Sequence, residues 1–220
     1  TRLGTGSILT GSGTFNTSNT VDLASNLTLS ATTPVLNFGG ASNAATVNAI
    51  TPGTTLTVAS GKTLTLANDT IGANVNLVNQ GYVVIPANTA SAISAGLSNA
   101  VGATIEIQSS DVCCTGAYNG TLTVASGFTN SGTLLLRSYG TVGAGTSRLD
   151  ISSGALTNAV GGVIQATGNV DSAVVNGQVL NSGTIQVDRS LTIGNTGLVF
   201  DTSTGTVSIA NGMSLSVNAG

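Results

Sequence analysis

The sequence predicts an all-β protein built as a parallel β-solenoid, and its internal repeats are the main reason. The phrase Thr-Leu-Thr-Val-Ala-Ser-Gly occurs at residues 55–61 and again at 121–127. A second phrase, apolar-x-Asn-x-Gly-x-apolar-x-apolar, occurs at 77–85, 128–136 and 179–187. Self-similarity with a period of roughly 20 to 50 residues is typical of proteins that stack one structural unit on the next.

The asparagines of the second phrase give the length of the repeat. Asn79, Asn130 and Asn181 follow one another at equal steps of 51 residues. Looser copies of the phrase place Asn99 and Asn158 between them, so the mean step is about 25 residues, the length of one solenoid coil. The sequence therefore predicts about nine coils of roughly 25 residues, in one domain that spans the whole chain.

The composition fits a long and narrow core. Of the 220 residues, 40% are hydrophobic but only 3% are aromatic and 6% are charged. The apolar residues are small and spread singly along the chain, as expected when each coil adds a few side chains to a shared core. So much Val, Leu and Ile with so little charge excludes an intrinsically disordered chain.

One copy of the two phrases predicts the elements of one coil. Residues 121–124 alternate Thr with Leu and Val, which predicts a strand with one buried face. A turn at 125–127 follows, Phe128 points inward, and a second turn at 130–132 leads into a strand at 133–136.

The same order returns elsewhere in the chain. Strand alternation is present at 21–23 and 27–29, and the full order is repeated over 149–158 and 207–217. The Ala- and Ser-rich stretch 90–101 comes nearest to helical periodicity, so one irregular turn of helix is expected there.

The two cysteines of the chain, Cys113 and Cys114, mark an insertion. They lie where the spacing of the asparagines stretches from 20 to 31 residues, which predicts a loop at about 109–120 that bulges from the rod. Loops on a rigid scaffold often carry binding. Asp111 and Tyr118 of this loop are therefore candidate contacts for a partner.

Three interpretations of Cys113 and Cys114 stay open: a vicinal disulfide, thiols without function, and covalent links between subunits. A vicinal bridge would be strained, because adjacent Cα atoms lie about 3.8 Å apart and ordinary bridges prefer about 4.4 to 6.8 Å. The first and third interpretations favour an oxidising, extracellular setting.

Three phrases resemble the β-strand repeats of bacterial surface proteins: Leu-Thr-Val-Ala-Ser-Gly (56–61 and 122–127), Leu-Thr-Asn-x-x-Gly (156–161) and Asn-Ser-Gly-Thr-Ile (181–185). Filamentous-haemagglutinin-like adhesins and autotransporter passenger domains are the families that they resemble, over residues 55–217. The resemblance implies a right-handed parallel β-helix on a cell surface. It also implies an extracellular stalk, adhesin or filament subunit whose activity is mechanical or adhesive.

The inventory of reactive side chains predicts that the chain is not an enzyme and holds no cofactor. There is no His, the usual general base and the commonest metal ligand. Asp150, Asp171 and Asp188 are spaced near one coil apart and could stack as the acids of a polysaccharide-cleaving β-helix. A polysaccharide-binding or -cleaving protein is therefore the alternative to solvated turn residues.

The sequence predicts no metal site, no nucleic-acid partner and no membrane span. The Gly- and Asp-rich nonapeptide of calcium-binding solenoids is missing, and five basic residues scattered over a chain of net charge −3 form no phosphate-binding stripe. No apolar run approaches the roughly 18 residues of a spanning helix. The chain begins at Thr1 rather than Met, from which we expect a mature or excised fragment.

The row of asparagines is predicted to be structural rather than a ligand-binding row. Stacked on successive coils, their side chains would form a ladder that closes the turns. The ladder would contain Asn79, Asn99, Asn130, Asn158 and Asn181.

Ice binding is a minor alternative, because Thr-x-Thr occurs at 121–123 and at two other places. An ice-binding plane needs this pair on the same face of every coil. At the corresponding positions we expect Arg148 and Asp150, and then Thr206 and Ser208, which would interrupt the plane.

The chain is finally expected to associate end to end. Residues 207–209 and 213–217 keep the coil pattern close to the last residue, without a capping element. Open strand edges of this kind pair with further strands. The expected partners are a second copy in a head-to-tail homopolymer, or flanking repeats of a longer chain, with host or matrix glycans as further candidates.

Overall fold

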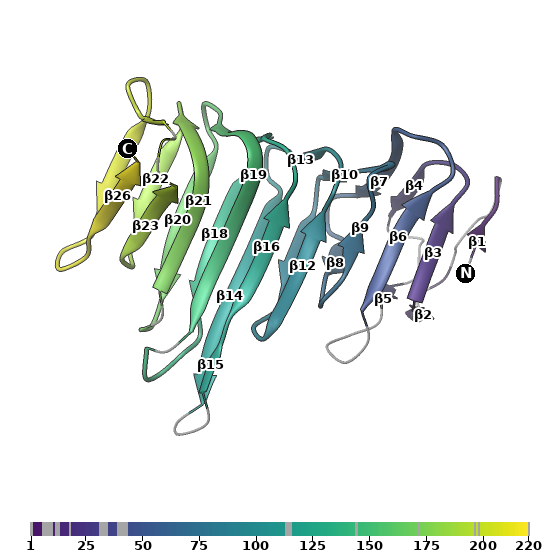
Figure 1. Cartoon of the computed structure of the whole chain (residues 1–220), viewed down its shortest axis with the longest axis horizontal. Helices are drawn as coiled ribbons and strands as arrows, with labels where there is room; N and C mark the ends of the chain where they lie inside the picture. Colours follow the sequence, from purple (N-terminus) through teal and green to yellow (C-terminus); the bar gives the residue numbers. More distant parts are fainter. Residues whose placement is uncertain are drawn as a thin grey trace.

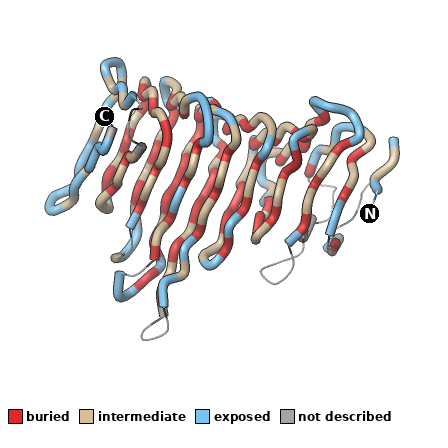
Figure 2. Tube along the Cα trace, in the orientation of Figure 1, coloured by how far each residue is buried: buried red, intermediate tan, exposed pale blue. Residues whose placement is uncertain are grey.

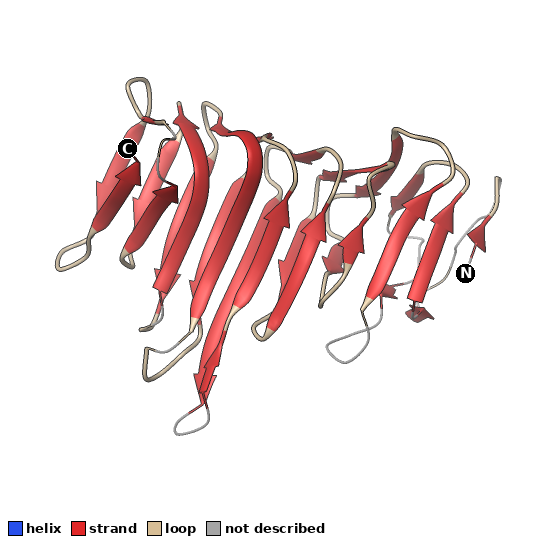
Figure 3. Ribbon diagram, viewed as in Figure 1, coloured by secondary structure: helices blue, strands red, loops and turns tan. Residues whose placement is uncertain are grey.

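The computed structural model describes residues 2–5, 11, 14–17, 19–30, 35–38, 44–112, 116–143, 145–170, 172–195, 197 and 199–219. This described part contains strands, turns and bends but no helix (Figure 3). The strands lie side by side along one long axis, with the two termini at opposite ends (Figure 1). The prediction of an all-β parallel solenoid is confirmed.

The strands form three stacks, which we call the first, second and third faces. The first face contains β1 (Arg2–Leu3), β3 (Asn19–Leu23), β6 (Ala45–Ala49), β9 (Thr70–Ile71), β12 (Thr89–Ile93), β16 (Gly120–Val124), the first halves of β19 (Thr146–Asn158) and β21 (Ser172–Asn181), β23 (Leu191–Asn195) and β26 (Leu215–Ala219). The second face contains β4 (Leu27–Leu29), β7 (Thr54–Val58), β10 (Val75–Asn79), β13 (Leu97–Asn99), β17 (Phe128–Asn130), the second halves of β19 and β21, and β24 (Phe200–Asp201). The third face contains β2 (Thr14–Thr17), β5 (Val35–Phe38), β8 (Thr63–Thr65), β11 (Tyr82–Ile85), β14 (Thr104–Val112), β18 (Thr133–Ser138), β20 (Val163–Gly168), β22 (Thr184–Val187) and β25 (Thr206–Ile209).

Each coil passes through the three faces in the same order. The third face receives one strand from each coil, nine in the described part, and β26 begins a further coil on the first face. Every strand pair between coils is parallel, for example β11 with β14. The expected number of about nine coils is therefore found.

The coils differ in length more than the mean repeat suggests. On the first face Val175 pairs with Ile193, only 18 residues on, whereas Ile93 pairs with Val124, 31 residues on. The pairing stays in register because the extra residues leave the coil at its corners, including the antiparallel strand β15 (Gly116–Tyr118) beside β14.

One prediction about local structure is wrong. The stretch 90–101, expected to include an irregular helical turn, forms strands β12 and β13 with a short corner between them. Ala and Ser are small enough for either structure. Parallel pairing of β12 with β9 and β16, and of β13 with β10, gives this stretch its strand conformation.

The core consists of columns of aliphatic side chains that run along the rod. Burial alternates residue by residue in most strands (Figure 2). Burying each Leu, Ile or Val contributes about 1.5 to 3 kcal/mol, so the core stabilises every coil separately. One fully buried column on the third face contains Leu64, Val83, Ile105, Leu134, Ile164 and Ile185.

Two kinds of turn alternate where the second face meets the third, and they explain the doubled period of 51 residues. In one kind, Lys62 N–H donates to the Ala59 carbonyl (3.0 Å) and Gly61 lies at φ 74°, a left-handed conformation that favours glycine. Gly102 and Gly161 have the same role two and four coils later, at φ 77° and 82°. The coil that follows each of these makes the other kind of turn, the shorter Asn-x-Gly, at 79–81, 130–132 and 181–183.

The glycine of the Asn-x-Gly turn lies directly against the preceding turn. A Cβ atom on Gly132 would lie 2.3 Å from the carbonyl oxygens of both Ala100 and Ala103, and Gly81 and Gly183 are equally crowded. Only a residue without a side chain fits there. A coil with the short turn therefore nests on a coil with the long turn, and the pair of coils is the true repeat.

We predict that Gly132→Ala destabilises the rod. The added methyl group would push the turn away from Ala100 and Ala103, at a cost of about 1 to 3 kcal/mol in unfolding free energy. Chemical denaturation followed by circular dichroism measures this. Ser131→Ala in the same turn is the control, and equal stability of the two variants would show that the nested turn is not required.

Candidate functional site

The five asparagines form one continuous column of hydrogen bonds. Each Nδ2 donates to the Oδ1 of the next asparagine: Asn79 to Asn99 (2.8 Å), Asn99 to Asn130 (2.7 Å), Asn130 to Asn158 (2.8 Å) and Asn158 to Asn181 (2.7 Å). All five are buried. The column runs inside the corner between the second and third faces, so its amides do not face a ligand.

The column also ties side chains to the backbone. The second Nδ2 hydrogen of Asn99 donates to the Thr133 carbonyl (3.0 Å), and that of Asn130 donates to the Val163 carbonyl (3.0 Å). At the C-terminal end Asn181 has no further asparagine to bind and donates to the Thr202 hydroxyl (3.0 Å) and to the Thr206 carbonyl (3.4 Å). The ladder therefore ends at Asn181, one coil before the coil that contains β25.

The predicted insertion loop is a β-hairpin. The end of β14 pairs antiparallel with β15, with Ser110 opposite Tyr118 and Asp111 opposite Ala117. The hairpin projects beyond the edge of the rod (Figure 1). Cys113 and Cys114 lie outside the described residues, so their three interpretations remain open.

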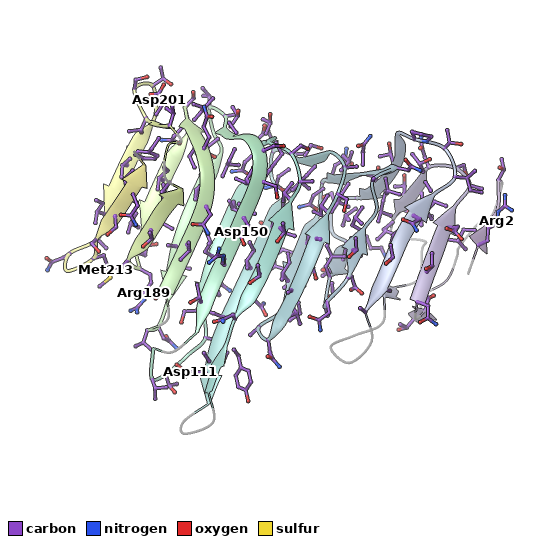
Figure 4. All side chains as sticks on the ribbon, viewed as in Figure 1. Arg2, Asp111, Asp150, Arg189, Asp201 and Met213 are labelled. Atoms are coloured by element: carbon purple, nitrogen blue, oxygen red, sulfur yellow. The ribbon has the colours of Figure 1, made fainter. Side chains whose placement is uncertain are left out.

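Asp111 holds the loop of the next coil. Its carboxylate accepts hydrogen bonds from the backbone N–H groups of Thr141 (2.6 Å), Val142 (2.9 Å) and Gly143 (2.7 Å). Asp111 is buried within the projecting hairpin, one residue beyond the Ser110–Tyr118 pair (Figure 4). This carboxylate binds within the chain, whereas Tyr118, which lies opposite Ser110 at the base of the hairpin, is partly exposed.

Two of the three spaced carboxylates, Asp150 and Asp188, lie on different faces and do not stack as a polysaccharide-cleaving site would require. Asp150 on the first face pairs with Asn176 of the next coil. Asp188 follows β22 on the third face, where Gln165 and Gln186 each donate to its Oδ2 (2.7 Å). Asp171 lies outside the described residues.

The Thr-x-Thr pairs do not stack either. Thr121 and Thr123 pair with Arg148 and Asp150, as expected, but the next coil continues with Val174 and Asn176. The expected continuation with Thr206 and Ser208 is wrong, because β25 belongs to the third face. The mean repeat length predicts the wrong face for β25, because the coil before it is unusually short.

A carboxylate that sequence reasoning missed lies on the outer surface of the third face. Glu106 is only 1% exposed although its position faces outward. The Tyr139 hydroxyl (3.0 Å) and Gln108 Nε2 (3.2 Å) donate to its Oε1, and Arg137 Nη1 lies 3.7 Å away. The spacing of Glu106 and Arg137 places them one coil apart, which is the signal that could have found this cluster.

Asp69 is a third buried carboxylate, at the corner between β8 and β9. Its oxygens accept hydrogen bonds from the backbone N–H groups of Ala45 (3.0 Å) and Ala67 (2.8 Å), and its own N–H donates to the Ser91 hydroxyl (3.1 Å). Burial raises the pKa of Asp69 from 3.8 to about 6, against the opposite effect of the two backbone hydrogen bonds.

The last coil exposes residues that belong to the core columns. Val187 is fully buried, and Ile209, its partner one coil later, is 48% exposed. Ile193 is 1% exposed, and its partner Val217 is 40% exposed. Figure 2 shows this end as mostly exposed, in contrast to the middle of the rod. Among the described residues, no segment covers it.

Comparison of the chain with protein-family profiles, with characterised proteins and with solved structures finds no match. Within the described ranges, no helix is long and apolar enough to cross a membrane. Nor does this part of the chain bring together three or more His, Cys, Asp or Glu side chains in a group that could hold a metal ion. The geometry of the rod is therefore the main basis for proposing a function.

We predict that breaking the ladder at its centre destabilises the rod without a change of fold. Asn130→Ala removes three hydrogen bonds and leaves buried amides of Asn99 and Asn158 with fewer partners, at a cost of about 1 to 3 kcal/mol. Asn130→Asp should cost more than Asn130→Ala at pH 7, because it buries a charged carboxylate against two acceptors, Asn158 Oδ1 and the Val163 carbonyl. Denaturation midpoints measure both, with the exposed Asn211→Ala as control, and unchanged midpoints would contradict a structural ladder.

Asp69 should make the rod less stable as pH rises. The folded chain binds the Asp69 proton more tightly than the unfolded chain, whose pKa is near 3.8. Stability is therefore lost as pH rises from about 4 through about 6. The measurement is the stability difference between the wild-type chain and Asp69→Asn from pH 4 to pH 7.5. It should shift in favour of the variant as pH rises, and a constant difference would show that Asp69 titrates normally.

Proposed function

We propose that this chain is a structural and adhesive module of an extracellular, cell-surface fibre, and that it associates end to end. The observation that carries the proposal is the uncovered core of the last coil, where Ile209 and Val217 continue the buried columns into solvent. A strand edge with an apolar inner face is a template for pairing with another strand.

The geometry of the last coil supports a continuing stack rather than a finished end. β25 and β26 keep the parallel register of β22 and β23 residue by residue. Within the described residues, neither strand pairs with a further one on its outer side. A following coil, whether of the same polypeptide or of a second copy, would cover both the backbone edge and the apolar side chains.

The surface chemistry supports a mechanical or adhesive role. Charged residues make up 6% of the chain, so little repulsion opposes association. The resemblance to filamentous-haemagglutinin-like adhesins and autotransporter passenger domains supports export to the cell surface. We propose no catalytic role, because the buried carboxylates Asp69 and Asp111 bind backbone N–H groups and Glu106 binds neighbouring side chains.

We predict that the chain at high concentration forms rods longer than one molecule, visible in negative-stain images and as a mass that rises with concentration in sedimentation. Ile209→Lys with Val217→Lys should keep the chain monomeric, because inward-pointing charges on an edge strand block pairing. A wild-type chain that stays a monodisperse monomer at every concentration would rule out end-to-end association.

A matched control separates the terminal coil from general hydrophobicity. Val101 and Val160 are both 83% exposed, but they lie in turns along the side of the rod. Val101→Lys with Val160→Lys changes charge and hydropathy equally, and should leave assembly intact. Loss of assembly in both double variants would mean that surface hydrophobicity, not the open coil, drives association.

A further inference from the structure

A polar groove crosses the outer surface of the first face towards the C-terminal end of the rod. Its volume is about 480 Å³. It lies where β19, β21, β23 and β26 pair side by side, and Asp150 marks it in Figure 4. The groove is lined by Arg148, Asp150, Ile151, Ser152, Asn176, Gly194 and Asn218.

The groove arises from a difference in coil length. Between the paired positions Asp150/Asn176 and Ala155/Gln178, β19 has four residues but β21 has one, Gly177. The extra residues bulge outward beside the groove, with Ser152 exposed. The following coil is short, with only 18 residues between the paired positions Val175 and Ile193. Bulges often stand next to binding sites, where they redirect side chains.

Hydrogen bonds hold the polar groups of the groove in place. Arg148 Nε donates to both carboxylate oxygens of Asp150 (2.8 and 2.9 Å), and Asn176 Nδ2 donates to Asp150 Oδ1 (2.7 Å). Within the described part of the chain, the Nη1 and Nη2 groups of Arg148 and the Oδ1 of Asn176 have no hydrogen-bond partner. Donors and acceptors are thus fixed side by side and free to bind a ligand.

The residues of the groove are poor choices for a strand. In the column of paired positions, the coils before the groove have Thr46, Thr70, Ala92 and Thr123. The groove continues this column with Asp150, Asn176, Gly194 and Asn218. Asp, Asn and Gly are depleted in strands. Residue types that disfavour the local secondary structure are expected at functional sites.

We propose that this groove binds a carbohydrate chain. Planar amide, carboxylate and guanidinium groups complement vicinal hydroxyl groups, each of which both donates and accepts a hydrogen bond. At about 4.8 Å per coil, the four column positions extend over roughly 14 Å, room for a short oligosaccharide along the rod axis. The ion pair of Arg148 and Asp150 leaves no positive surplus for a nucleic acid. The inference is independent of end-to-end association.

An array of immobilised neutral and uronate-containing oligosaccharides, probed with the labelled full chain, tests the proposal. Wild type should bind at least one of them. Asp150→Asn and Asn176→Ala should each weaken that binding about tenfold, equivalent to about 1.4 kcal/mol. Asp188→Asn is the matched control, because Asp188 accepts amide hydrogen bonds on a different face and should bind as wild type does.

A further variant separates binding from folding. Gly194→Thr places a strand-forming residue in the groove floor, where a Cβ atom would lie 2.9 Å from Asn176 Oδ1. It should abolish binding while the denaturation midpoint stays equal or rises. Absence of binding to every oligosaccharide by the folded wild type, or equal binding by wild type and Gly194→Thr, would overturn the proposal.

Discussion

Parallel pairing of each coil with the next, on three faces at once, is the constraint on which this structure depends. Because paired residues point to the same side, every side chain stands on its counterpart in the preceding coil. Aliphatic residues then form continuous columns such as Leu122, Leu149, Val175 and Ile193, and asparagines form a continuous ladder. The small share of aromatic and charged residues follows, since bulky or like-charged side chains do not repeat well at about 4.8 Å.

The constraint also explains which features could be predicted from the sequence. Phrases that repeat in the sequence repeat in space, so the strands, the number of coils and the column of Asn79, Asn99, Asn130, Asn158 and Asn181 follow from spacing alone. The doubled period was visible as equal steps between Asn79, Asn130 and Asn181. Its cause is the nesting of Gly132 against the preceding turn, a contact between coils that the spacing does not indicate.

Features that depend on unequal coil lengths could not be predicted. The groove beside Asp150 exists because β19 bulges between Asp150 and Ala155, and Thr206 lies on the third face because the preceding coil is short. The burial of Glu106 on an outer surface by Arg137 and Tyr139, 31 and 33 positions later, differs from these features, because a spacing of one coil could have indicated it. Insertions at the corners change which residues meet, and a mean repeat length does not contain this information.

The same pairing leaves the strands of the last coil with a partner on one side only among the described residues, as it does β1 and β2 at the other end of the rod. Hydrogen exchange measured at low and at high protein concentration tests this most directly. The account predicts that amides of β22 are protected at both concentrations, and that those of β25 and β26 exchange quickly in dilute solution and slowly in concentrated solution. Slow exchange in β25 and β26 at both concentrations would show that the last coil is already covered, and would contradict the account.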